Sequence, residues 1–215
     1  MHYTSVLFDL DGTLLDTLGD LTAAMNRTLT RHGLPERTRQ QMRAALGNGA
    51  RRLMELSVPA GTDGALFETL LAEYNTDYAA HCRIETAPYP GVDALLRQLH
   101  AQGRKLAIVS NKPDEAVRAL RAEFFVDTVP IAVGEKQGIR RKPAPDTLLT
   151  AMAQLGAERT STVYVGDSEV DIATARAAGL PCISVLWGFR DRDLLEQAGA
   201  QQFAADADEL ARLLD

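Results

Sequence analysis

Two aspartates near the start of the chain are spaced so that they could act together on one substrate. Asp9 and Asp11 follow an apolar run, and a glycine and a threonine come next, in the order Asp9-Leu10-Asp11-Gly12-Thr13. On a strand, residues i and i+2 point to the same side, so both carboxylates would lie together. Like charges repel, so the pair needs a cation, a shared proton or splayed side chains. An ordinary Asp-Gly turn after a strand has the same sequence, and the motif alone leaves both interpretations open.

The elements that position these acids follow from the periodicity of the rest of the chain. Beyond Gly91, stretches with helical spacing of apolar residues alternate with short apolar runs, which are typical of buried strands. The predicted strands cover residues 4–8, 105–110, 129–133, 162–165, 182–186 and 202–204. This alternation predicts right-handed crossovers and a parallel sheet covered by helices on both faces.

The segment after the first strand has a different pattern. Residues 16–85 contain about four stretches with helical spacing, separated by glycine and proline, and no convincing strand. We therefore expect an α/β fold whose core is a Rossmann-like, three-layer parallel sheet formed by residues 1–15 and 86–215. Residues 16–85 are expected to form a small all-α cap domain inserted into this core.

Polar groups follow four of the predicted strands, where ligands of an open parallel sheet bind. Besides the first two aspartates they are Thr13, Ser110, Asn111, Lys142, Asp167 and Asp171. Several acids, a hydroxyl and a lysine at one edge would suit a hard divalent cation and a phosphate. Because all the acidic ligands offer oxygen, the pattern favours Mg²⁺.

These segments resemble, in order, the four sequence motifs of the haloacid dehalogenase superfamily. Residues 9–13 resemble its nucleophile motif, and Ser110 at a strand end resembles the second motif. Lys142 before a proline resembles the third, and residues 166–171 resemble the acidic fourth. The resemblance covers nearly the whole chain, and residues 16–85 correspond to the helical cap of the family.

The resemblance implies transfer of a phosphoryl group from a small phosphate ester through an aspartyl-phosphate. Asp9 is expected to be the nucleophile, Asp11 the general acid and base, and Lys142 the group that offsets negative charge. Mg²⁺ is expected between the Asp9 carboxylate, the Asp11 carbonyl and Asp167, with Asp171 binding it directly or through water. Thr13, Ser110 and the amides of Leu10 and Asn111 are expected to hold phosphate oxygens.

Other residues near these motifs are expected to be structural. Ser168 is expected to cap the helix that follows it. Lys112, Arg140 and Arg141 are expected to be solvated surface charges. Trp187 and Phe189 follow the last long strand, and packing in the core or at its rim is the role expected for them.

Two other activities of the superfamily fit less well. Dehalogenases of this superfamily have another residue in place of the second acid and do not use Mg²⁺. This chain has Asp11 at that position. Phosphonatases use a lysine of the cap to form a Schiff base, and residues 16–82 contain no lysine. A sugar phosphomutase of the β-phosphoglucomutase type shares all four motifs and stays an alternative.

A glycine loop in the predicted cap resembles the specificity loop of phosphoglycolate phosphatases. Gly47 and Gly49 precede a helix that carries Arg51 and Arg52, so backbone amides and an arginine could bind the carboxylate of a small acid phosphate. The alternative is an interhelical turn with both arginines in solvent. The resemblance favours phosphoglycolate phosphatase over phosphatases of pyrophosphate, nucleotides or sugar phosphates, and a non-catalytic binding module is the remaining alternative.

Composition limits the partners and the location. The 23 basic and 29 acidic residues give a net charge of −6, so no nucleic-acid partner is expected. The two cysteines, Cys82 and Cys182, are too few for a disulfide framework and suit a reducing compartment. The first five residues show no secretory signal, and no run approaches the roughly 18 apolar residues of a membrane span. We expect a cytoplasmic monomer or homodimer that binds a small-molecule phosphate ester and no membrane.

Overall fold

A computed structural model describes residues 3–215, in which the chain forms two compact units. One unit contains the described residues up to Leu15 together with Pro88–Asp215, and the other contains Asp16–Ala87. Met1 and His2, which belong to the predicted core domain and to the N-terminal segment considered above, lie outside the described residues. The chain passes between the units at β2 (Leu15–Asp16) and β3 (Ala87–Pro88), which pair with each other.

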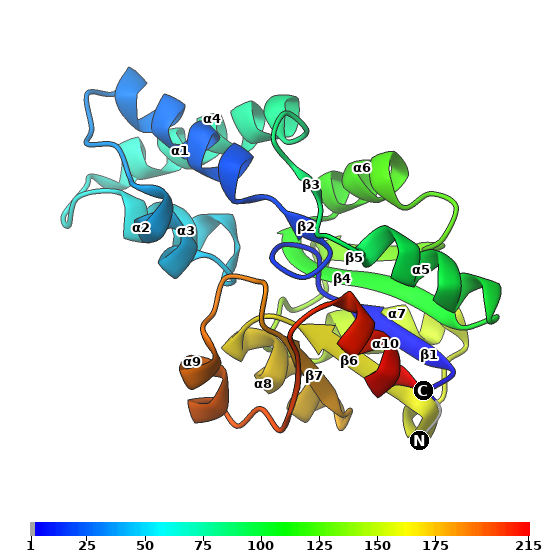
Figure 1. Cartoon of the computed structure of the whole chain (residues 1–215). Helices are drawn as coiled ribbons and strands as arrows, with labels where there is room; N and C mark the ends of the chain where they lie inside the picture. Colours follow the sequence, from blue (N-terminus) through cyan, green and yellow to red (C-terminus); the bar gives the residue numbers. More distant parts are fainter. Residues whose placement is uncertain (1–2) are drawn as a thin grey trace. The chain divides into compact units, whose positions relative to one another are not determined.

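The first unit is built on a six-stranded parallel sheet with the strand order β5-β4-β1-β6-β7-β8 (Figure 1). Its strands are β1 (Ser5–Phe8), β4 (Lys105–Pro113), β5 (Ile131–Glu135), β6 (Thr162–Gly166), β7 (Cys182–Val185) and β8 (Gln202–Ala204). The central strand β1 lies between β4 and β6, and Phe8 is aligned with Ile108 and Val165. The segments that follow these three strands therefore meet at one edge of the sheet.

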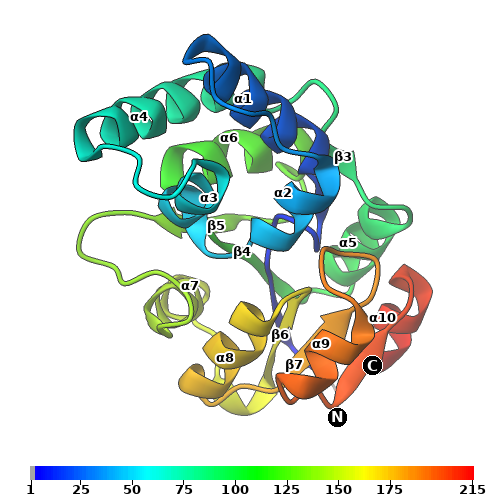
Figure 2. The same ribbon diagram turned by 90° about the vertical axis from the view of Figure 1, so that its left-hand side faces the viewer.

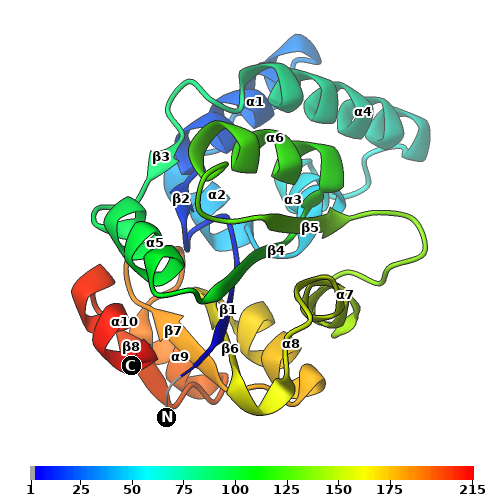
Figure 3. The same ribbon diagram turned by 90° about the vertical axis from the view of Figure 1, so that its right-hand side faces the viewer.

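Helices cover both faces of this sheet. They are α5 (Val92–Ala101), α6 (Asp114–Phe124), α7 (Asp146–Leu155), α8 (Glu169–Ala178), α9 (Arg192–Gln197) and α10 (Ala207–Leu214), with a short 3₁₀ turn at Arg159–Ser161. In Figure 3, α5 and α10 lie on one side of the sheet and α7 and α8 on the other. The predicted α/β fold with a three-layer parallel sheet is confirmed. None of the helices formed by residues 3–215 combines the length and apolarity that a membrane span requires.

Two strands differ from the predicted ranges by more than one residue at an end. The strand predicted at 129–133 begins later, at Ile131. The strand predicted at 105–110 continues to Pro113, and its register against β5 shifts between Val109 and Pro113. A shift of this kind changes the side to which the following side chains point. Residues 110–112 are affected, and they belong to the site described below.

The second unit consists of four helices, α1 (Leu18–Arg31), α2 (Arg39–Ala45), α3 (Gly49–Ser57) and α4 (Gly64–His81), between the residues of β2 and β3 at its ends. Figure 2 shows α1 and α4 side by side. Met25, Leu29 and Leu70 are fully buried in this unit. A capping box at Thr38 begins α2, and the Asp63 carboxylate accepts two backbone N–H groups at the start of α4.

One buried carboxylate connects the two ends of this helical unit. Asp20, in the first turn of α1, accepts hydrogen bonds from the N–H groups of Ile84, Glu85 and Thr86 and from the Thr86 hydroxyl, at 2.8–3.0 Å. The segment that leaves the unit is thereby held against the helix that enters it. The Asp20 carboxylate and Thr86 are buried, so the two donors of Thr86 have no comparable replacement for this acceptor.

We predict that Asp20→Ala increases local opening at residues 84–86. Losing the charged acceptor should lower the free energy of opening by about 2 kcal/mol, so these amides should exchange with solvent hydrogen about 30-fold faster. Hydrogen exchange resolved by mass spectrometry measures this. Asp63→Ala, which removes an exposed cap in the same unit, should accelerate exchange only at the start of α4. Unchanged exchange at 84–86 in Asp20→Ala would contradict the role given to this carboxylate.

Candidate active site

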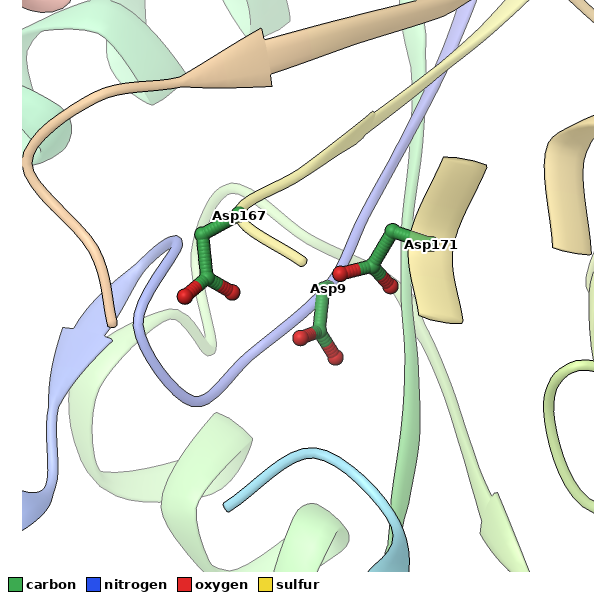
Figure 4. Close-up of side chains that lie close together, drawn as sticks. All are labelled: Asp9, Asp167 and Asp171. Atoms are coloured by element: carbon green, nitrogen blue, oxygen red, sulfur yellow. The ribbon is translucent and has the colours of Figure 1, made fainter. Parts of the chain in front are cut away.

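Three buried aspartates converge at the carboxyl edge of the sheet. Asp9 follows β1, Asp167 follows β6, and Asp171 lies in the first turn of α8. One carboxylate oxygen from each lies within 4.8 Å of the others. Figure 4 shows the three side chains, from different segments, turned toward the same small region. The structure thus brings together acids that are far apart in the sequence.

A lysine ammonium lies among these acids. Lys142 Nζ donates hydrogen bonds to Asp9 Oδ1 and to Asp171 Oδ1, both at 2.7 Å, and the side chain is buried. The backbone of Lys142 is held by the Asn111 side chain, whose Nδ2 donates to the Lys142 carbonyl while its Oδ1 accepts from the Lys142 N–H. Asn111, predicted to hold phosphate through its amide, therefore also positions the lysine.

Tyr164 is a member of this cluster that the sequence analysis did not identify. Its hydroxyl donates to Asp171 Oδ1 at 2.9 Å and accepts from Lys142 Nζ at 3.0 Å. Tyr164 is fully buried on β6, in an apolar run where it has the appearance of a core residue. The signal that could have revealed it is the hydroxyl itself, since a buried tyrosine usually finds a polar partner.

Asp171 is surrounded by donors. Besides Lys142 and Tyr164 on Oδ1, the Ser168 hydroxyl and the Ser168 N–H donate to its Oδ2, at 2.6 and 3.1 Å. Ser168 caps α8 in a capping box with Asp171, so the predicted cap is confirmed. Both oxygens of Asp171 thus accept from protein groups, which favours a role in holding Lys142 over direct metal ligation.

Asp167 is held by two segments of the chain. Its Oδ2 accepts the N–H of Phe189 at 2.7 Å, and its Oδ1 accepts the Thr13 hydroxyl at 3.3 Å. Gly12 has a φ of +86°, and a Cβ there would lie 2.4 Å from Asp167 Oδ2, so glycine is required at this position. Phe189 is buried as expected, but the backbone of its loop also binds the site, which the sequence analysis did not predict.

Burial and mutual repulsion set the electrostatics of the three acids. Burial, together with the neighbouring carboxylates Asp171 and Asp167, raises the pKa of Asp9 well above its usual value, against the opposing effect of Lys142. Burial and Asp171 raise the pKa of Asp167 to about 7. Burial alone would raise the pKa of Asp171 too, but Lys142, Ser168 and Tyr164 lower it. Asp9 and Asp167 are therefore the acids whose negative charge is least compensated.

This distribution of charge fits a hard cation. Asp9 and Asp167 offer oxygen ligands whose ionised forms a cation would stabilise, and oxygen is what Mg²⁺ binds in proteins. Asp171 already has its compensation from Lys142. The residues present thus fit the expected ion, with Asp9 and Asp167 as the carboxylate donors.

Lys112 lies in this site, and its expected role as a solvated surface charge is wrong. Its side chain is only 5% exposed, and its Nζ lies 3.0 Å from Asp11 Oδ1, in an ion pair. The reason is the continuation of β4 past Ser110 with a shifted register. Ser110 is buried as well, and its hydroxyl accepts the N–H of Lys112 at 3.2 Å. Arg140 and Arg141, by contrast, are exposed as expected.

The glycine loop that was predicted to read the substrate lies in the helical unit. Gly47 and Gly49 have φ values of 108° and 79°, which favour glycine. Arg51 makes a two-pronged ion pair with Glu68, at 2.7 and 2.9 Å, and Arg52 pairs with Glu55 at 2.9 Å. Both arginines are about half exposed. Their contact with a substrate stays a prediction.

The chain is similar to known proteins in both sequence and structure. A family model described as haloacid dehalogenase-like hydrolase matches residues 6–185. A phosphoglycolate phosphatase of Xanthomonas campestris pv. campestris is 37% identical over 187 residues, which cover 86% of this chain and 84% of the relative. An N-acetylmuramic acid 6-phosphate phosphatase of Pseudomonas aeruginosa is 32% identical over 190 residues, covering 88% and 84%. A crystal structure of a protein from Lactobacillus delbrueckii subsp. bulgaricus has a TM-score of 0.94 and 36% identity, covering 100% and 99%.

Mg²⁺ should bind more tightly as the pH rises through 7, because burial and Asp171 raise the pKa of Asp167 to about 7. A protonated carboxyl is a poor ligand, so the ion must displace a proton at low pH. For one proton, the Kd at about pH 6 should be about tenfold that at about pH 8. Calorimetry in buffers of different ionisation enthalpy measures affinity and proton release together. Equal affinity at both pH values without proton release would contradict the fit of the ion to this site.

Tyr164→Phe should lower kcat about tenfold with KM within about twofold, since Lys142 and Asp171 each lose a hydrogen bond that fixes them. Steady-state kinetics measure this change. Thr174→Val is the matched control, because the Thr174 hydroxyl is also buried but donates to the Val170 carbonyl on α8. It should cost similar stability and leave kcat unchanged. If both variants lose kcat equally, Tyr164 acts only through general stability.

Proposed function

The chain belongs to the haloacid dehalogenase-like hydrolases and is a phosphoric monoester hydrolase, and we propose that 2-phosphoglycolate is the ester that it hydrolyses. The observation that carries the reaction type is the pairing of Asp9 with Lys142 beside Asp167 at the carboxyl edge of the sheet. The relatives named phosphoglycolate phosphatase, including one from Rhodospirillum rubrum that is 34% identical over 204 residues, support the choice of substrate.

The contacts support two steps, in which Asp9 first accepts the phosphoryl group and then releases it. In the first, a carboxylate oxygen of Asp9 attacks phosphorus, the bond from phosphorus to the ester oxygen breaks, and Asp11 gives that oxygen a proton. In the second, Asp11 takes a proton from water, the water oxygen attacks the same phosphorus, and phosphate leaves Asp9. Glycolate and inorganic phosphate are the products, and Asp9 and Asp11 return to their starting states.

Charge compensation makes the first step possible. Mg²⁺, when bound by Asp9, Asp167 and the Asp11 carbonyl, lets a carboxylate and an anionic phosphate approach each other. Lys142 holds one Asp9 oxygen, which orients the other toward the substrate. Thr13 and Ser110 stay the expected hydroxyl donors to phosphate oxygens, together with the backbone amides of residues 10 and 111.

The helical unit is the proposed cap. Its role would be to close over the substrate and exclude water, and the glycine loop with Arg51 and Arg52 would contact the part of the substrate beyond the phosphate. Both arginines pair with glutamates of their own unit, so binding a carboxylate would require them to exchange partners. Neither Cys82 nor Cys182 forms a disulfide, in keeping with the proposed cytoplasmic location.

A second candidate substrate is a sugar phosphate. The relative named N-acetylmuramic acid 6-phosphate phosphatase is nearly as similar to this chain as the relatives named phosphoglycolate phosphatase. That sugar phosphate also carries a carboxylate, so charge alone does not separate the two substrates. The two substrates differ in size, and the set of substrates tested below includes both.

Purified protein with Mg²⁺ should release phosphate from 2-phosphoglycolate with a higher kcat/KM than from N-acetylmuramic acid 6-phosphate, pyrophosphate or a nucleotide. Glucose 1-phosphate should not be isomerised. Asp9→Asn should lower kcat by about 10³-fold or more with the fold intact, since an amide in place of the nucleophilic carboxylate does not form the phosphoryl-enzyme. A higher kcat/KM on another ester would refute the substrate, and activity within tenfold of wild type in Asp9→Asn would refute the nucleophile.

A further inference from the structure

We propose that Lys112 gives the enzyme its preference for esters with a negatively charged leaving group, an inference that rests on the proposed function. Lys112 lies in the core unit, in the segment where β4 continues beyond Val109 with a shifted register. Its ammonium is held near the centre of the reaction by the ion pair with Asp11.

The burial of this lysine needs a reason. An ammonium group that leaves water loses hydration, and this cost is met only when charged partners stay close. The Lys112 side chain is 5% exposed, whereas the Asp11 side chain is 19% exposed. Asp11 is thus the more exposed member of the pair, and Lys112 is the more buried one.

The position of Asp11 in the reaction determines what Lys112 meets. Asp11 gives its proton to the oxygen that leaves phosphorus, so it must lie within hydrogen-bonding reach of that oxygen. The atoms attached to this oxygen then lie next to Asp11 and within reach of its partner, Lys112. A carboxylate on the leaving group would come within reach of Lys112 while Asp11 carries the proton that it donates. The Lys112 ammonium would then exchange its ion pair with Asp11 for one with the leaving-group carboxylate, and it would pair with Asp11 again once the proton has left.

The two buried lysines, Lys142 and Lys112, therefore have different roles. Lys142 contacts Asp9, Asp171 and Tyr164, on the side of the nucleophile. Lys112 contacts Asp11, on the side of the leaving group. A neutral leaving group would depend on Lys142 only, whereas an anionic leaving group would depend on both Lys142 and Lys112. This division predicts discrimination between substrates that differ only in charge at the leaving group.

A matched pair of substrates tests this prediction. Ethyl phosphate is 2-phosphoglycolate with the smaller, neutral methyl group in place of the carboxylate, and both have poor leaving groups that need the Asp11 proton. We compare the ratio of kcat/KM for 2-phosphoglycolate to kcat/KM for ethyl phosphate across variants. Lys112→Met should lower this ratio at least tenfold, chiefly through KM, and Lys112→Arg should restore most of it. Arg140→Met, which removes an exposed charge, is the control that should keep the ratio.

Lys112→Gln keeps a hydrogen-bond donor toward Asp11 without the charge, and it replaces Lys112→Met if that variant does not fold. Equal losses on both substrates would overturn the proposal, because Lys112 would then only position Asp11. An unchanged ratio in the Lys112 variants, with a fall in Arg51→Met or Arg52→Met, would overturn it in favour of the cap arginines. If the wild-type enzyme itself shows no preference for 2-phosphoglycolate, the proposed function fails, and this inference fails with it.

Discussion

One buried ammonium group, that of Lys142, makes the acidic edge of the sheet possible. It is hydrogen-bonded to Asp9, Asp171 and Tyr164 in a part of the protein from which water is largely excluded. Burying a carboxylate costs free energy unless a charge or strong donors compensate it, and three carboxylates in one place add repulsion. The chain places this lysine through a loop whose backbone is held by Asn111 in a reciprocal pair of hydrogen bonds.

Lys142 compensates the charges of the three acids unequally, and this difference suggests their roles. Asp171, which has donors on both oxygens, stays ionised and holds the lysine. Asp9 and Asp167 have raised pKa values because burial and neighbouring acids penalise their charge. They are the acids that gain most from a bound cation. A cation and an anionic substrate would therefore complete a balance of charge that the protein alone leaves incomplete.

The parts of this site that the sequence could predict follow from residue type and from strand ends. Asp9, Asp167 and Lys142 each follow a strand, and the rule for parallel sheets brings such residues to one edge. Tyr164 was not predicted, because a tyrosine in an apolar run has the same pattern as a core aromatic, and its hydroxyl was the one sign of a polar partner. Lys112 was missed because the predicted strand ended at Ser110, and the shifted register of β4 decides where the next side chains point.

The loop of residues 187–189 was missed for another reason. Its contribution to Asp167 is a backbone N–H, and any residue except proline carries one. The two domains were expected from the loss of strand signals between residues 16 and 85, which is a property of long segments. Single contacts depend on the direction of one bond, and a pattern of residue types contains little of that information.

Asp9 is the residue proposed to carry the phosphoryl group between the two steps. This role is tested most directly by quenching the Mg²⁺-loaded enzyme with acid during turnover of 2-phosphoglycolate and mapping the added mass by peptide mass spectrometry. Asp11→Asn should be included with p-nitrophenyl phosphate, whose leaving group does not need the Asp11 proton, because slow hydrolysis of the intermediate should then increase its amount. One phosphoryl group is expected on Asp9. Turnover with the phosphoryl group on another residue would contradict this role.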